Sequence, residues 1–172
     1  MKRITNIIFF VTLLFSVISA QEEQAEFYTK VGQKVPSFEF KSIDGKSYKI
    51  EDFKGKYVLI NFFATWCGPC MREMPEMEKE IWDKLKKEDF VVIAIGREHT
   101  IDELKKFNEE KKFTFIIGAD PDREIYSKFA PSLIPRNYVL DKTGKIIYQK
   151  DGYSNVEFFK LTTLLKDLFK EN

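Results

Sequence analysis

The stretch "NFFATWCGPCMREMP", from Asn61 to Pro75, contains both cysteines of the chain, Cys67 and Cys70. The apolar run "YVLINFFA" reaches into it and predicts a strand that is buried on both faces. The segment that follows, through residue 87, has apolar residues three or four positions apart and predicts a helix that Pro75 kinks. The cysteines therefore lie where a buried strand ends and a helix begins.

Strand and helix patterns alternate along the rest of the chain. "SFEFKSIDGKSYKI" predicts a β-hairpin, and "FVVIAIG" and "FTFIIG" predict two more buried strands. "TIDELKKFNEE" predicts a helix, and "PDREIYSKF" predicts a short helix with Pro121 in its first turn. "RNYVL" and "KIIYQK" predict a hairpin before an amphipathic helix over residues 156–169. This order predicts an α/β sandwich, in which chemistry is located at the carboxyl ends of strands.

The first twenty residues predict a secretory signal peptide. Lys2 and Arg3 precede an apolar stretch that ends at the small residues Ser19 and Ala20. Because this stretch is too short to span a bilayer comfortably, we expect cleavage after Ala20, and an uncut membrane anchor is the alternative. In either case the protein is expected in an exported, periplasmic compartment.

Length and composition predict one globular domain. The chain has 172 residues, of which 44% are hydrophobic and 32% charged, enough to bury a core without a disulfide. Residues 21–34 are polar and predict a linker, which leaves residues 35–172 for the domain. The formal net charge of +1 predicts no binding of nucleic acid. No long exposed apolar stripe calls for a dimer, so we expect a monomer.

The two thiols have three conceivable roles. A structural disulfide is common outside the cytosol, but a Cys67–Cys70 bond closes a very small loop and adds little stability. Zinc sites need about four N or S ligands and copper sites usually include a histidine. The single histidine, His99, lies in a polar segment and is expected to face solvent. We therefore expect no metal, and no cofactor other than the cysteine pair.

A redox role fits the position of the cysteines better. The start of a helix offers unpaired N–H donors and the positive end of the macrodipole, and both favour a thiolate at Cys67. Cys70 lies one turn further on the same face, where it can attack a mixed disulfide formed at Cys67. We therefore predict that Cys67 is the nucleophile and Cys70 the resolving thiol.

Together, "WCGPC", the strand before it and the kinked helix after it resemble the thioredoxin superfamily, and in particular its exported thiol–disulfide oxidoreductases of the TlpA/ResA type. The resemblance extends from about Val35 to the C-terminus. It implies a thioredoxin-like three-layer α/β/α sandwich whose mixed central sheet carries an added N-terminal β-hairpin. It also implies reduction of disulfide-containing partner proteins, and an upstream membrane thiol electron donor that regenerates the pair.

The resemblance assigns roles to two further residues. "LIPRNYVLDKTGKI" is similar to the segment in which a cis proline faces the cysteines, so the Ile134–Pro135 bond is expected to be cis and to lie beside an extended substrate segment. Thioredoxins have a buried Asp where this chain has Asn61. The exported relatives instead use a Glu that matches Glu73, which would accept the proton of the resolving thiol. A solvated Glu73 is the alternative.

Two more residues near the pair are candidates for binding the substrate. Arg136 stands where Thr commonly follows the cis proline, and a guanidinium near Cys67 would favour the thiolate or select acidic partners. A solvent-facing Arg136 is the alternative. Trp66 is expected to shield the site as an apolar rim, or simply to pack.

Two other functions remain as alternatives. A thiol peroxidase is one, because peroxiredoxins resemble this chain in fold and in the opening "PSFEF…DGK". Their peroxidatic cysteine follows a Pro and a Thr, whereas this chain has Ala64 and Ile60 at those positions. A copper-handling or non-catalytic binding module is the other, because a soft thiol pair can bind Cu(I).

Overall fold

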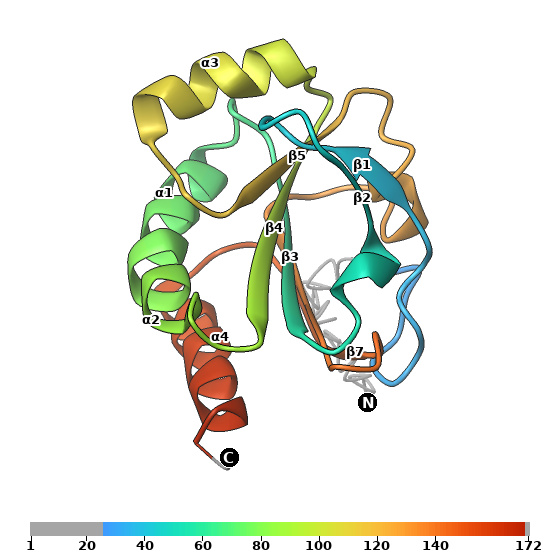
Figure 1. Cartoon of the computed structure of the whole chain (residues 1–172), viewed down its shortest axis with the longest axis vertical. Helices are drawn as coiled ribbons and strands as arrows, with labels where there is room; N and C mark the ends of the chain where they lie inside the picture. The colour runs from blue at the N-terminus through green and yellow to red at the C-terminus, as the bar shows by residue number, and fades with distance from the viewer. Residues whose placement is uncertain (1–25, 171–172) are drawn as a thin grey trace, which may run out of the picture.

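A five-stranded sheet with the strand order β5-β4-β3-β6-β7 forms the centre of the molecule (Figure 1). Its central strand β3 (Tyr57–Phe63) pairs in parallel with β4 (Phe90–Arg97) and antiparallel with β6 (Arg136–Leu140). The edge strands are β5 (Ile116–Asp120), parallel to β4, and β7 (Ile146–Asp151), antiparallel to β6. The mixed sheet predicted from the sequence is thus present, with β3 buried along nearly its whole length.

The computed structural model describes residues 26–170. The predicted signal peptide and residues 21–25 of the predicted linker lie outside the described residues. Residues 26–34 of that linker are hydrogen-bonded to the domain: the N–H of Tyr28 donates to Phe129 O at 2.8 Å, and that of Gly32 to Ile146 O at 2.7 Å. In the described part of the chain, no helix combines the length and the apolar composition that crossing a membrane requires.

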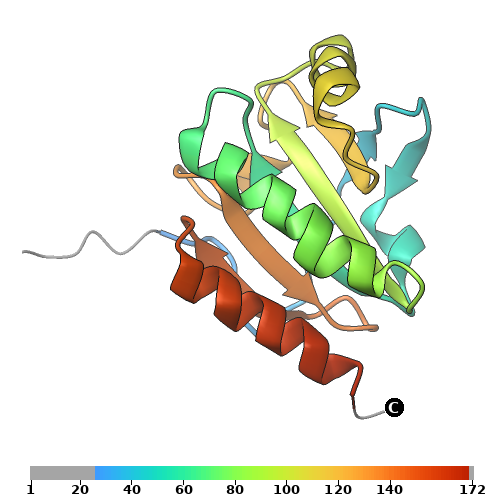
Figure 2. The same cartoon turned by 90° about the vertical axis from the view of Figure 1, so that its left-hand side faces the viewer.

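One face of the sheet is covered by α1 (Gly68–Glu76), by its continuation, and by α4 (Asn155–Leu168), which Figure 2 shows running side by side. The buried apolar residues of α4, Phe158, Leu161 and Leu165, belong to one cluster with residues of β3 and β4, whereas Val156 and Phe159 are exposed, although helical spacing predicts Phe159 on the apolar side. Helix α3 (Ile101–Lys111) contributes Leu104 to the same cluster. Its N-cap Thr100 and Glu103 form a capping box, as "TIDE" predicts.

The other face is covered by the added hairpin of β1 (Glu39–Lys41) and β2 (Ser47–Lys49). Two 3₁₀ helices complete this layer, η1 (Ile50–Phe53) and η3 (Tyr126–Lys128). Their side chains form a second apolar cluster with the sheet, which includes Phe38, Phe40, Ile50, Phe53 and Phe129. The sheet is therefore buried between two apolar layers.

The helix after the cysteines departs from a regular α-helix at the predicted place. Pro75 lies inside α1, and the next six residues form a π-helix, η2 (Met77–Trp82), before the short α2 (Asp83–Leu85). Proline lacks the N–H of an i→i−4 bond and its ring displaces the preceding carbonyl. A wider π turn is one way in which a helix accommodates this loss.

The prediction of a short helix over "PDREIYSKF" is mostly wrong. Only η3 is helical in this segment. Arg123 has a left-handed φ of 60°, through which an α-helix does not continue. The Asp120 carboxylate instead accepts the N–H groups of Ile125 and Tyr126, at 3.0 and 2.8 Å, and organises a loop.

The added hairpin packs on the sheet through a glycine. A Cβ built on Gly118 of β5 would meet the ring of Phe40, and would lie 2.9 Å from Ile95 Cδ1.

Because a packed core resists added methyl groups, we expect Gly118→Ala to lower the free energy of unfolding by about 1–3 kcal/mol. Urea unfolding monitored by circular dichroism measures this. Adding Phe40→Leu should recover part of the loss, and an additive double mutant would contradict the close approach.

Candidate active site

Cys67 and Cys70 form a disulfide whose two Cα atoms are 5.3 Å apart. Cys67 is the N-cap of α1, with extended backbone angles, and its Sγ accepts the N–H of Cys70 at 3.2 Å. Pro69 lies in the first turn, where its missing N–H has no partner to lose. Cys67 is 6% exposed and Cys70 is fully buried. An incoming sulfur can therefore reach only Cys67, whose negative charge the N–H of Cys70 stabilises.

The loop before β6 closes over the cysteines. The Ile134–Pro135 bond is cis, as the resemblance implies. The carbonyl oxygen of Ile134 lies 3.7 Å from Cys67 Sγ. Leu133, one residue earlier, is half exposed and has a left-handed φ of 69°. This loop and the start of α1 together form the surface around the reactive sulfur.

Trp66 is the exposed residue directly before Cys67, with 62% of its surface accessible. The guanidinium of Arg97, at the end of β4, lies 5.5 Å from the centroid of its ring. On its other side the same guanidinium lies 4.9 Å from the ring of Tyr126. Trp66 therefore presents an apolar surface beside the site, as a rim residue would, with a cation behind it.

Glu73 is buried and its carboxylate is bound by two asparagine side chains, so the alternative expectation that Glu73 is solvated is wrong. Its carboxylate accepts the amide of Asn61 at 2.9 Å and the amide of Asn137 at 2.6 Å. Only 2% of Glu73 is exposed. Burial raises its pKa from the ordinary value of 4.5 to about 7, although the two amides act in the opposite direction. Glu73 can therefore take up or release a proton near neutral pH.

Asn137 is a site residue that our sequence analysis does not identify. It lies opposite Asn61 in the antiparallel pairing of β3 with β6, and Asn61 also donates to its side-chain oxygen at 2.9 Å. One signal was available, because an asparagine is unusual inside a buried apolar strand such as "RNYVL". That signal does not reveal its partner, which depends on the register of the sheet.

A narrow pocket connects this network with the surface. It has a volume of about 10 Å³ and is lined by Glu73, Asn137, Tyr148 and Tyr153, among others. This is about the space that one water molecule needs. Glu73 lies one helical turn beyond Cys70, a spacing that places two side chains on the same face. Glu73 therefore lies between the helical turn that carries Cys70 and this pocket.

Neither position expected for Arg136 is correct. Its side chain is fully buried, so it does not face solvent. Successive residues of a strand point to opposite faces. Since Asn137 points to α1, Arg136 points to the hairpin face, where its guanidinium lies 4.3 Å from the ring of Phe27. Its hydrogen bonds go to backbone carbonyls, including that of Ser132 at 2.8 Å.

His99 is buried, and its expected exposure to solvent is wrong. Only 7% of it is accessible, and its Nε2 accepts the N–H of Thr65 at 3.0 Å. In the neutral ring the hydrogen is therefore on Nδ1, which is 3.8 Å from the Glu103 carboxylate. Thr65 is two residues before Cys67, so His99 helps to shape the reactive loop. Among residues 26–170, no group of three or more His, Cys, Asp or Glu could hold a metal ion.

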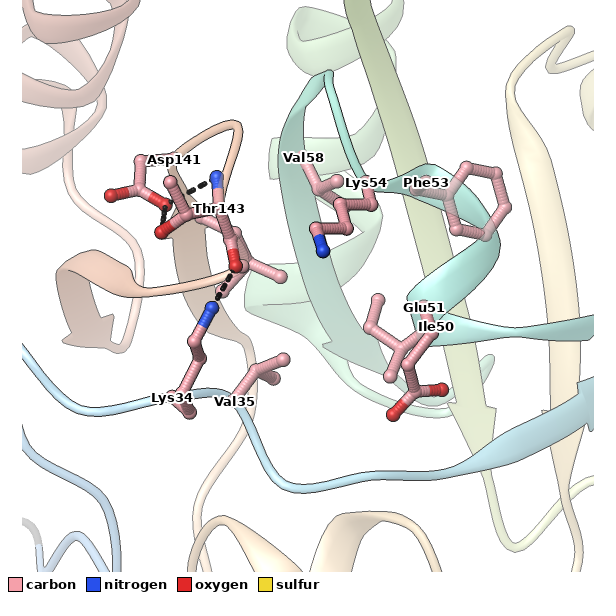
Figure 3. A pocket seen from close by; sticks show the side chains of 11 residues that line it. Lys34, Val35, Ile50, Glu51, Phe53, Lys54, Val58, Asp141 and Thr143 are labelled. Atoms are coloured by element: carbon pink, nitrogen blue, oxygen red, sulfur yellow. Dashed lines mark hydrogen bonds between the residues drawn. The ribbon is translucent and has the colours of Figure 1, made fainter.

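A pocket of about 340 Å³ lies away from this site (Figure 3). It is lined by Val58 at the start of β3 and by Leu140 at the end of β6, whereas Cys67 follows the other end of β3. Lys34 closes one side by a hydrogen bond to the carbonyl of Thr143. The pocket therefore takes no part in the chemistry of the cysteines.

A buried strand that delivers two cysteines to a helix start, opposite a cis proline, defines the class of thioredoxin-like thiol–disulfide oxidoreductases. The solution structure of a candidate protein disulfide isomerase from Bacteroides thetaiotaomicron superimposes on this fold with a TM-score of 0.80. The two are 33% identical, and the match covers 85% of this chain and 94% of the other. The pneumococcal exposed lipoprotein thioredoxin of Streptococcus pneumoniae has the same fold, at 24% identity and a TM-score of 0.65, over 77% of this chain and 99% of the other.

The chain belongs to the AhpC/TSA family, whose model matches residues 31–149. The thiol–disulfide oxidoreductase ResA of Bacillus cereus is 32% identical to it over 144 residues, which are 84% of this chain and 80% of the relative. These matches confirm the thioredoxin-like fold and the thiol–disulfide oxidoreductase activity predicted from the sequence.

The raised pKa of Glu73 predicts a pH-dependent stability. Between about pH 4.5 and 7 the folded carboxyl is protonated and the unfolded one ionised, so stability falls as the pH rises through this window. We expect the oxidised protein to lose roughly 3 kcal/mol across it, relative to Glu73→Gln, which has no proton to release. Urea unfolding of both proteins from pH 4.5 to 8 measures the difference. Parallel curves would contradict a buried, titrating Glu73.

Proposed function

We propose that this protein is an exported reductase of protein disulfides. The cationic and apolar start of the sequence supports export, and one structural relative is named an exposed lipoprotein thioredoxin. The difference between the two sulfurs supports the chemistry: Cys67 keeps 6% of its surface accessible, whereas Cys70 is fully buried one turn from a carboxyl whose pKa is about 7. This asymmetry is the observation that carries the proposal.

The reaction begins with attack of the Cys67 thiolate on a disulfide sulfur of the partner. The partner's S–S bond breaks, its first thiol leaves and takes a proton from water, and a mixed disulfide forms on Cys67. Glu73 then takes the proton of Cys70, and the resulting thiolate attacks Cys67 Sγ. The mixed disulfide breaks, and the second sulfur of the partner leaves as a thiolate that takes a proton from water. The partner has gained two electrons, and the Cys67–Cys70 disulfide has formed.

The surroundings of Cys67 suit an extended substrate segment. Trp66 and Leu133, which precede Cys67 and Ile134 in the chain, are exposed apolar residues, and the Ile134 carbonyl of the cis-proline loop lies beside the sulfur. The oxidised pair must be reduced again before the next cycle. Because the exported space lacks the cytosolic thiol pool, we assign this step to a thiol donor in the membrane.

Replacement of the resolving thiol should trap the intermediate. We expect Cys70→Ser to form a stable mixed disulfide with a disulfide-bonded protein such as insulin, because no second thiol can release it. Mass spectrometry under non-reducing conditions detects the adduct. Cys67→Ser is the matched control and should form none, since its remaining thiol is buried. A trap at Cys70 in that control would overturn the assigned roles.

The direction of the reaction is tested by the reduction potential. Equilibration of the wild-type pair in redox buffers, with free thiols counted by mass spectrometry, should give about −250 mV or lower, in the range of reducing thioredoxins. A value of about −120 mV would instead indicate a disulfide-forming oxidant.

Consumption of hydrogen peroxide by the reduced protein, measured in parallel, tests the peroxidase alternative that the family match keeps relevant.

A further inference from the structure

The cis-proline loop is held in place by a buried arginine. The Nε and Nη2 atoms of Arg136 donate to the carbonyl of Ser132 at 3.0 and 2.8 Å, and Nε also donates to that of Leu133 at 3.2 Å. The hydroxyl of Tyr126 donates to the same two carbonyls. These carbonyls belong to the residues directly before Ile134, whose own carbonyl contacts Cys67.

The same guanidinium binds a segment from the other end of the chain. Nη2 donates to the carbonyl of Glu26 at 2.9 Å, across 110 positions of sequence. The ring of Phe27 lies 4.3 Å below the guanidinium and packs edge-on against Tyr138 at 6.1 Å. Residues 26–27, which we call the strap, thus cover Arg136 on the hairpin face of the sheet.

These contacts are particular to arginine. Its planar fork offers five donors, and its planar face stacks on an aromatic ring, so one side chain can serve the loop and the strap together. The hydrogen bonds of its Nε and Nη2 all end on backbone carbonyls, and no carboxylate of the described residues forms an ion pair with it. A buried charge of this kind depends on the fixed orientation of its acceptors. The Ser132 and Leu133 carbonyls are therefore constrained by it.

The loop needs such a constraint. Leu133 holds a left-handed φ of 69°, which is unfavourable for a residue with a Cβ, and its side chain is half exposed beside the site. Two donors, Arg136 Nε and the Tyr126 hydroxyl, converge on its carbonyl. Without them, the loop would relax to commoner backbone conformations and leave its position against Cys67.

We propose that Arg136, covered by the strap, is a positioning residue that holds residues 132–135 in the conformation that a substrate segment meets at Cys67. Arg136 does not touch the reacting sulfur. It acts through the Ser132 and Leu133 carbonyls and so through Ile134. The inference rests on the proposed reduction of protein disulfides for its effect on substrate binding, while its effect on the loop is independent of that function.

The test compares Arg136→Lys and Phe27→Leu with Phe159→Leu, a matched change at an exposed phenylalanine of α4. Lysine keeps the charge but not the fork, and leucine keeps the apolar cover but not the aromatic face. Insulin reduction with dithiothreitol as donor gives KM and kcat. For Arg136→Lys we expect KM to rise about tenfold with kcat nearly unchanged, and a smaller rise for Phe27→Leu. Phe159→Leu should match the wild type.

Hydrogen exchange tests the conformation of the loop independently of the activity. We expect the amides of Leu133 and Ile134 to exchange faster in Arg136→Lys and Phe27→Leu than in the wild type, while those of the central strand β3 keep their protection. Unchanged exchange at both amides, or an unchanged KM in a folded Arg136→Lys, would overturn the inference. If Arg136→Lys does not fold, Phe27→Leu decides by the same two readouts. Wild-type protein that fails to reduce insulin would refute the proposed function, and the exchange data would still decide on the loop.

Discussion

The register of β3 against β6 is the constraint on which the site depends. With Asn61 opposite Asn137, the two amides meet over the Glu73 carboxylate, and the cis proline at the start of β6 arrives beside the cysteines at the end of β3. A slip of one residue would turn Asn137 to the hairpin face and Arg136 to the face of α1. It would place a guanidinium against the carboxyl and leave the loop without its anchor. One pairing therefore determines both the surroundings of Glu73 and the position of the cis-proline loop.

The two cysteines differ in exposure, although only two residues separate them and both border the same apolar cluster. Cys67 lies at the start of a helix, where N–H groups favour the ionised sulfur and some surface remains open. Cys70 is closed in by the apolar cluster of α1 and α4, where ionisation is unfavourable without a proton acceptor. Burial raises the pKa of Glu73, and its two neutral amide partners offset this rise only in part. In the proposed reaction the buried thiol therefore acts second, after substrate has occupied the first.

The errors of the sequence analysis have three different origins: a contact distant in sequence, the alternation of side chains along a strand, and a local side-chain hydrogen bond. His99 lies in a polar segment, yet its side chain is buried and accepts the N–H of Thr65. Arg136 follows the cis proline and so was placed near Cys67, whereas strand alternation turns it to the other face. For "PDREIYSKF" the helical composition was real, but the Asp120 carboxylate captures the N–H groups that a helix would use.

By itself the sequence determined the order of strands and helices, the buried character of β3, the position of both cysteines at a helix start and the interruption of the helix near Pro75, but not that this interruption takes the form of a π turn. These follow from local chemistry, namely the periodicity of apolar residues, the geometry of proline and the capping of helix ends. Only the tertiary structure decided that Asn137 joins Glu73, that His99 holds the loop before Cys67, and that residues 26–27 cover Arg136. These contacts join residues 34 to 110 positions apart, and the register that makes them is set by packing of the whole sheet.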